Sequence, residues 1–309
     1  MAEHGESVDY LDPAHLMGHV KDADYFEVPR VLGGPDGHLA IPQPIADPEA
    51  LGVSWKLRTG IEGLDGLVQP LDFHVTKFMV LEVVAAVILI GVFVTLARMM
   101  SSGDRPRGRF WNLFETMLLF IRDEVARPAI GRHDADRFLP FLWTMFFFVL
   151  TCNLLGMVPW AGSPTGSLAT TGVLALVTFS VVLGAGMSKM GVIGFWVGQV
   201  PHMDLPLPIA ILLKPMIFAI EVLGMFIKHF VLAVRLLANM AAGHLVLAVL
   251  IAFIAVAWRE GFVIAGAVSV ASISGAFALS MLELFVAFLQ AYIFTFLSAL
   301  FIGMAVHPH

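Results

Sequence analysis

Long apolar runs separated by short polar breaks fill the chain from residue 78 onward. The first run, FMVLEVVAAVILIGVFVTLA at 78–97, is just long enough as a helix, at about 1.5 Å per residue, to cross the roughly 30 Å hydrocarbon layer of a bilayer. Pro, Gly and Ser mark the breaks that follow. The pattern predicts an all-α protein with membrane helices at about 78–98, 138–158, 172–188, 209–257 and 262–306.

The last two runs are too long for one upright helix each. They hold 49 and 45 residues and are interrupted only by WREG at 258–261. As single helices they are roughly 73 and 67 Å long, so they span the bilayer only if they lie at about 25° to its plane. The alternative is that each breaks into two upright helices, with Lys228 and His229 forming one turn. We therefore expect a polytopic membrane protein of five to six membrane helices, the last two forming a long, strongly tilted hairpin.

Composition agrees with a membrane setting. The 309 residues are 58% hydrophobic and 14% charged, with a mean hydropathy of +0.85. A water-soluble fold would need an implausibly large dry core, so a bilayer is the expected surrounding. Cys152 is the single cysteine, which excludes a disulfide within the chain and favours a buried packing role.

The charges are distributed asymmetrically. Residues 1–77 carry 13 acidic and 5 basic side chains and form an acidic extramembrane arm, ahead of a membrane domain at 78–309. Residues 98–137 contain eight arginines, so by the positive-inside rule this loop is cytoplasmic, the N-terminus outside and the C-terminus cytoplasmic. Apolar residues at helical spacing predict a surface helix at about 110–127, which Pro128 is expected to end.

Polar residues interrupt the first of the two long runs at regular spacing. Glu221, Lys228 and Arg235 recur every seven residues, and each step of seven rotates a helix by only about −20°, so the three share one stripe. Asn239 lies about 40° from Arg235 around the axis, whereas His244 points about 180° away. This helix therefore has two polar faces.

The last run has a polar line of its own. Glu283 and Gln290 are seven residues apart, and Ser280 lies one turn before Glu283. Buried Gln, Asn and Ser are usually satisfied by neighbouring helices, but an unpaired Arg235 in hydrocarbon costs at least about 2.5 kcal/mol. We expect its partner to come from elsewhere, and we expect Glu283 and His244 to suit proton transfer.

The residues just described carry a family resemblance. The run RLLANMAAGH at 235–244 resembles the signature helix of subunit a of F-type ATP synthases. The resemblance extends upstream to Glu221 and Lys228, to the helix LELFVAFLQAYIFTFL, and to NLLGMVP at 153–159, so it covers roughly residues 70–306. The acidic arm before residue 70 matches nothing recognisable, and its role stays open.

The resemblance implies a stator subunit that forms two offset half-channels for protons against a ring of c subunits, each with one membrane carboxylate. It implies that b subunits of a peripheral stalk, other ATP synthase subunits and membrane lipid are partners, in a bacterial inner membrane or another energy-coupling membrane. It implies no cofactor, metal or nucleic acid, and it places ATP chemistry on partner subunits, so this chain alone is not the enzyme. The site residues it implies are Arg235 between the half-channels, Asn239, His244, Glu283 and Gln290 at the outer one, and Glu221 at the cytoplasmic one.

One exchange of residues makes a geometric prediction. In the enterobacterial pattern of the family, Glu stands at the position of His244 and His at the position of Glu283; this chain has the reverse, as mitochondrial members do. Two side chains that trade places are best explained by adjacency. We therefore expect His244 and Glu283 to lie close enough to pass a proton directly or through water.

Two other classes of protein compete with this interpretation. A proton-coupled secondary transporter also uses intramembrane Glu, His and Arg, but it usually has paired halves, and the sequence has no internal repeat. A metal or haem redox subunit is disfavoured because His229 and His244 lie about 60° apart around the axis and over about 20 Å apart along it. The sequence leaves open the choice between H⁺ and Na⁺ and the stoichiometry of the ring.

Overall fold

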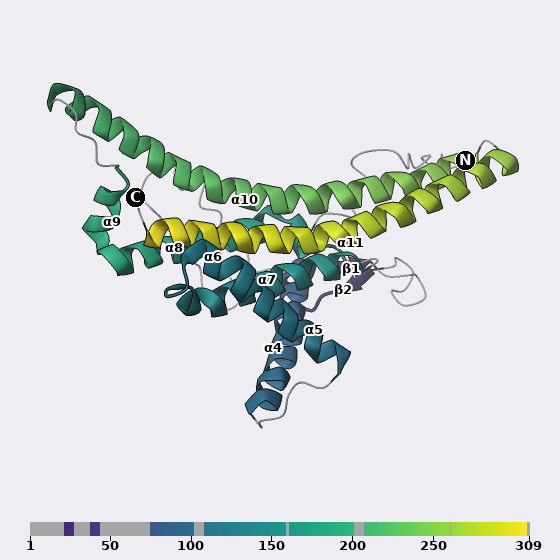
Figure 1. Cartoon of the computed structure of the whole chain (residues 1–309). Helices are drawn as coiled ribbons and strands as arrows, with labels where there is room; N and C mark the ends of the chain where they lie inside the picture. Colours follow the sequence, from purple (N-terminus) through teal and green to yellow (C-terminus); the bar gives the residue numbers. More distant parts are fainter. Residues whose placement is uncertain are drawn as a thin grey trace, which may run out of the picture.

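The computed structural model describes residues 22–27, 38–43, 75–101, 108–158, 161–200, 207–259 and 261–307, which are almost entirely helical. Among these residues, five helices are long and apolar enough to cross a membrane, so the chain is a multi-pass α-helical membrane protein. These five are α4 (Lys77–Ser101), α7 (Ala135–Gly156), α8 (Leu168–Met190), α10 (Leu207–Ala257) and α11 (Phe262–Val306) (Figure 1). The shorter helical elements are α5 (Arg109–Phe120), η1 (Ile121–Ala126), α6 (Arg127–Ile130), η2 (Pro164–Gly166) and α9 (Val192–Gly198).

Helices α10 and α11 form the expected hairpin. They are continuous over 51 and 45 residues, so the alternative of a break at Lys228 and His229 is wrong. The reason is local: Pro215 lies in the first part of α10, and no further proline follows it in that helix. Figure 1 shows α10 and α11 side by side, crossing α4 instead of running along it. This crossing is the arrangement expected of a strongly tilted hairpin beside an upright helix.

Helix α7 is the central element of the packed core. It contacts α4, η1 and α11, and more of its residues are buried than exposed because it is surrounded by other helices. The rings of Phe93, Phe114 and Phe147 meet edge-on or stacked, with centroids 4.8 to 5.9 Å apart, and join α4, α5 and α7. Helix α7 thereby presents one side to α11, where the polar residues lie.

The predicted surface helix extends further than expected. Helix α5 passes into the π-helical turn η1 and then into α6, which includes Pro128 and ends at Ile130, directly before Gly131, where φ is 97°. The expectation that Pro128 ends the helix is therefore wrong. Pro128 lies in the first turn of α6, where its missing N–H has no required partner within that helix.

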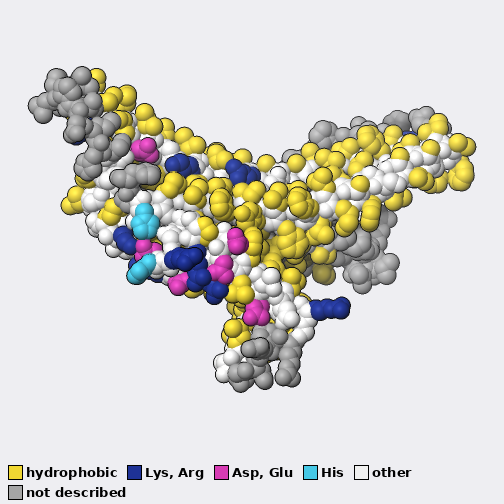
Figure 2. All heavy atoms as spheres, in the orientation of Figure 1, with side chains coloured by type: hydrophobic (Ala, Val, Ile, Leu, Met, Phe, Trp, Pro, Cys, Tyr) yellow, Lys and Arg dark blue, Asp and Glu magenta, His cyan; other side chains and the backbone are white. Residues whose placement is uncertain are grey.

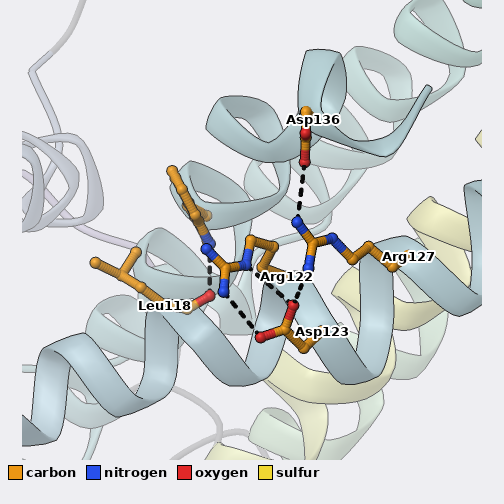
Figure 3. A network of polar contacts seen from close by, with 6 residues as sticks. Leu118, Arg122, Asp123, Arg127 and Asp136 are labelled. Atoms are coloured by element: carbon orange, nitrogen blue, oxygen red, sulfur yellow. Dashed lines mark hydrogen bonds and ion pairs between the residues drawn. The ribbon is translucent and has the colours of Figure 1, made fainter. Parts of the chain in front are cut away.

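A network of ion pairs follows this surface segment (Figure 3). Asp123 accepts hydrogen bonds from Arg122 and, at 2.6 Å, from Arg127, which also lies 3.9 Å from Asp136 at the start of α7. The hydrogen bond from Arg122 holds the pKa of Asp123 below its ordinary value. The short bonds of the network lie within the surface segment, and the longer contact of Arg127 with Asp136 is its link to the start of α7.

Asp134 joins the ends of three helices. Its carboxylate lies 2.7 Å from Lys189 at the end of α8 and 3.4 Å from His307 just after α11, directly before α7 begins. The hydrogen bond from Lys189 lowers the pKa of Asp134. The start of α7 and the ends of α8 and α11 therefore lie at one end of the molecule.

Part of the acidic arm is described and contacts α4. Strands β1 (Tyr25–Glu27) and β2 (His38–Ala40) pair antiparallel, with Phe26 opposite Leu39. Gln43 exchanges two hydrogen bonds with the backbone of Val75 just before α4. Most of the arm predicted over 1–77 lies outside the described residues.

Candidate functional site

The polar lines of α10 and α11 meet in the hairpin. Asn239 Nδ2 on α10 donates to Gln290 Oε1 on α11 at 2.8 Å. The side chain of Gln290 is buried, and its Nε2 has no hydrogen-bond partner within the described part of the chain. This pair fixes the register of the two helices one turn beyond Arg235.

A backbone carbonyl oxygen lies within hydrogen-bond distance of each ring nitrogen of His244. Nδ1 lies 2.9 Å from the Met240 carbonyl oxygen, and Nε2 lies 2.9 Å from the Gly156 carbonyl oxygen at the end of α7. A neutral imidazole has one N–H and donates to one of these oxygens, whereas the imidazolium donates to both. Glu283 Oε1 lies 3.3 Å from Nδ1, which confirms the adjacency predicted from the exchanged residues.

Glu283 reaches His244 across a glycine. The Glu283 side chain is only 7% exposed. A Cβ at Gly243 would lie 2.5 Å from Glu283 Oε1, closer than atoms can approach, so no other residue at 243 leaves the carboxylate in place. The hydrophobic and polar pattern of the sequence does not reveal this requirement; its one signal is the glycine directly before His244.

A buried polar network supports the same site from α7. Asn153 Nδ2 donates to the Ala287 carbonyl on α11 at 3.2 Å, and its Oδ1 accepts from Thr165 at 2.8 Å. Ser163 bonds Thr165 at 2.9 Å, and a Cβ at Gly156 would lie 2.5 Å from the Ser163 side chain. The turn after α7 is thus packed against the residue whose carbonyl accepts from His244.

The charged stripe of α10 is arranged differently. Glu221 and Lys228 are exposed and Arg235 is half-buried. Within the described residues, none of the three makes a hydrogen bond or an ion pair. Figure 2 shows isolated charged side chains along α10 among hydrophobic ones. The structure therefore brings together Asn239 with Gln290 and His244 with Glu283, and leaves Glu221 and Arg235 without a partner from the described chain.

Two further observations bear on chemistry. Glu221 and Lys228 line a cavity of about 240 Å³ between α8, α9, α10 and α11. Among the described residues, no group of three or more His, Cys, Asp or Glu is placed to hold a metal ion. The site consists of titratable and hydrogen-bonding side chains inside membrane helices. Such side chains are associated with ion and proton pathways.

Fold and site thus define a multi-pass helical membrane protein with ionisable residues held in and beside a long helical hairpin. Comparison with known proteins specifies the family. The model of the ATP synthase A chain matches residues 79–303. The ATP synthase subunit a of Myxococcus xanthus (strain DK1622) is 39% identical over 292 residues, 93% of this chain and 92% of that protein.

Two other relatives carry the same description. The ATP synthase subunit a of Anaeromyxobacter sp. (strain Fw109-5) is 35% identical over 100% of this chain and 73% of its own length. That of Chloroherpeton thalassium (strain ATCC 35110 / GB-78) is 42% identical over 76% and 67%. The chain belongs to the ATP synthase subunit a family and is a non-catalytic membrane subunit of an ATP synthase.

Proposed function

We propose that this chain is the stator subunit of a proton-translocating F-type ATP synthase and forms two half-channels that pass protons to and from the carboxylates of a c-subunit ring. One observation carries the proposal. Arg235 is a fixed cation on a membrane helix, half-buried and without a partner in the described chain. A carboxylate on another subunit supplies the missing counter-charge.

The chemistry of Arg235 follows from its charge. A guanidinium favours the ionised form of a carboxylate that passes it, so it drives that carboxylate to release its proton. Because the guanidinium does not deprotonate, it also prevents protons from crossing directly between the half-channels. Protons must then travel on the ring, and rotation is coupled to their flow.

The other site residues take roles on either side of Arg235. His244 and Glu283, 3.3 Å apart, exchange protons in the outer half-channel, and the bond between Asn239 and Gln290 holds α10 against α11 next to it. Glu221 belongs to the cytoplasmic half-channel, beside its cavity.

The orientation follows from the positive-inside rule, with the N-terminus outside and the C-terminus in the cytoplasm. The membrane is a bacterial inner membrane, and b subunits of the peripheral stalk are further partners.

The test replaces Arg235 in the assembled complex. Arg235→Ala is expected to reduce proton-driven ATP synthesis in membrane vesicles to background, and Arg235→Lys to reduce it strongly, because an ammonium can give up its proton. His133→Gln, at an exposed position outside the membrane helices, is the control with unchanged synthesis. Proton-driven synthesis retained by Arg235→Ala would overturn the proposal.

A further inference from the structure

His229 is a buried titratable residue that the proposed mechanism does not use. It lies on α10 with 5% of its surface exposed, and its ring is packed between Phe179 of α8 and Phe301 of α11, each 5.0 Å away between centroids. Nδ1 lies 2.8 Å from the Met225 carbonyl, to which it donates. Nε2 then carries a lone pair and is buried with no hydrogen-bond partner within the described residues.

Packing alone does not explain a histidine at this position. A buried acceptor left without a donor destabilises a fold, and a phenylalanine ring would fill the space between Phe179 and Phe301 without that cost. Buried unsatisfied polar groups in native proteins often mark a functional role or a bound water. The environment of Nε2 indicates which role applies.

The ring of His229 forms part of the wall of the cavity of about 240 Å³ that Glu221 and Lys228 also line. One water in the liquid occupies about 30 Å³, so the cavity has room for several. Gln199, Glu221 and Lys228 supply polar partners for such waters. Met225 and Met304 also line it, and methionine side chains are flexible enough to open Nε2 to the cavity.

The charged groups facing this cavity come from α10 itself. They are Glu221 and Lys228, whereas α8 contributes Val182, α9 contributes Phe195 and Gly198, and α11 contributes Phe301, Met304 and Ala305, none of which carries a charge. His229 lies eight residues, about 12 Å, beyond Glu221 and six residues, about 9 Å, before Arg235. It therefore stands between the acid and the arginine along the helix.

We infer that His229 is a proton-relay residue of the half-channel on the Glu221 side, an inference that rests on the proposed function. Nε2 takes a proton from a hydronium ion or a protonated Glu221 in the cavity, forming an imidazolium and leaving water or the Glu221 carboxylate. The imidazolium then gives the proton from Nε2 to a water nearer Arg235. In the opposite direction of rotation the same steps run in reverse, with no net change in His229.

The experiment compares two variants in the assembled complex. His229→Phe keeps the ring packing and removes both nitrogens; His229→Gln keeps a hydrogen-bonding amide that cannot carry a proton. ATP-driven proton pumping and proton-driven synthesis are measured in vesicles while the pH on the Glu221 side is varied, with assembly checked by immunoblot. Both variants are expected to assemble, to lose about tenfold or more in rate and to lose the wild-type pH dependence on that side.

The outcomes separate a relay from a packing residue. Wild-type rates and pH profile in an assembled His229→Phe, or in His229→Gln if the Phe variant does not assemble, would overturn the inference. His133→Gln is again the control. If the His229 variants behave as wild type while Arg235→Ala is uncoupled, only the relay is wrong; if Arg235→Ala still couples, the proposed function itself is wrong.

Discussion

At the scale of single residues, the pair His244 and Glu283 depends on a glycine. The exchange of Glu and His relative to the enterobacterial pattern was enough to predict their adjacency, because it links two positions that are 39 residues apart. The carbonyl oxygens of Met240 and Gly156 were not predictable in the same way. Backbone acceptors have no side-chain signature, and which helix end meets a histidine depends on tertiary packing.

Gly243→Ala tests the close approach of Glu283 to α10. The added Cβ would occupy the position 2.5 Å from Glu283 Oε1, so the carboxylate must move away from His244. Proton-driven ATP synthesis is expected to fall about tenfold or more, because a proton transfer distance lengthens. Gly266→Ala on α11 is the control, since no atom lies within 4 Å of its added Cβ, and it should keep the wild-type rate. Equal rates in the two variants would contradict the steric requirement.

At the scale of elements, the length and apolar character of the last two runs predicted the hairpin, but not its continuity. The charge of Lys228 and the imidazole of His229 indicated a possible turn, whereas in the structure Lys228 is exposed and His229 is buried between two aromatic rings. Lys228 and His229, although adjacent in sequence, therefore lie on different faces of one continuous helix. Periodicity cannot distinguish this from a break, because both leave the side chain of Lys228 exposed at the surface of the chain.

A cysteine pair tests the contact between α10 and α11 near the loop that joins them. Leu250 Cδ1 lies 3.8 Å from the position of a Cβ at Gly275, so α10 and α11 are still in contact well beyond the site. Leu250→Cys with Gly275→Cys is expected to form a cross-link with a short thiol-reactive reagent, detected as a mobility change after cleavage of the loop at 258–261. Leu250→Cys alone leaves only the buried Cys152 as a second thiol and should form none. No cross-link in the double variant would contradict the packing of α10 against α11 at this level.

At the scale of the whole molecule, the structure has one charged end and a largely apolar remainder. Figure 2 shows the charged side chains gathered around the segment from α5 to α7 and the end of the chain, while α10 and α11 present mostly hydrophobic side chains. The eight arginines in 98–137 predicted a charged region. They did not predict which helix ends meet there. That depends on Asp134, whose partners Lys189 and His307 are 55 and 173 residues away in sequence.

Asp134→Asn tests how far this end stabilises the fold. The pKa of Asp134 is lowered from 3.8, mainly by the hydrogen bond from Lys189, so its contribution is present above the ordinary pKa and is lost as pH falls through the lowered value. The variant is expected to have a lower thermal unfolding temperature than the wild type at pH 7, and the difference should shrink as the pH falls below about 4 and vanish below the lowered pKa of Asp134. Differential scanning fluorimetry in detergent measures it. Asp136→Asn, at a 63% exposed side chain, should show little difference at any pH.

The continuity and tilt of α10 also determine how a membrane voltage acts on this subunit. His229 and His244 are about 22 Å apart along the helix, but at the tilt of about 25° to the membrane plane that the helix length predicts, they differ in depth by only about 9 Å. Most of their separation is lateral. Under the proposed function, the ring carries a proton sideways between two half-channels, so the electrical work of about 2.3 kcal/mol per 100 mV for a full crossing is done in the half-channels and drives motion along the membrane plane.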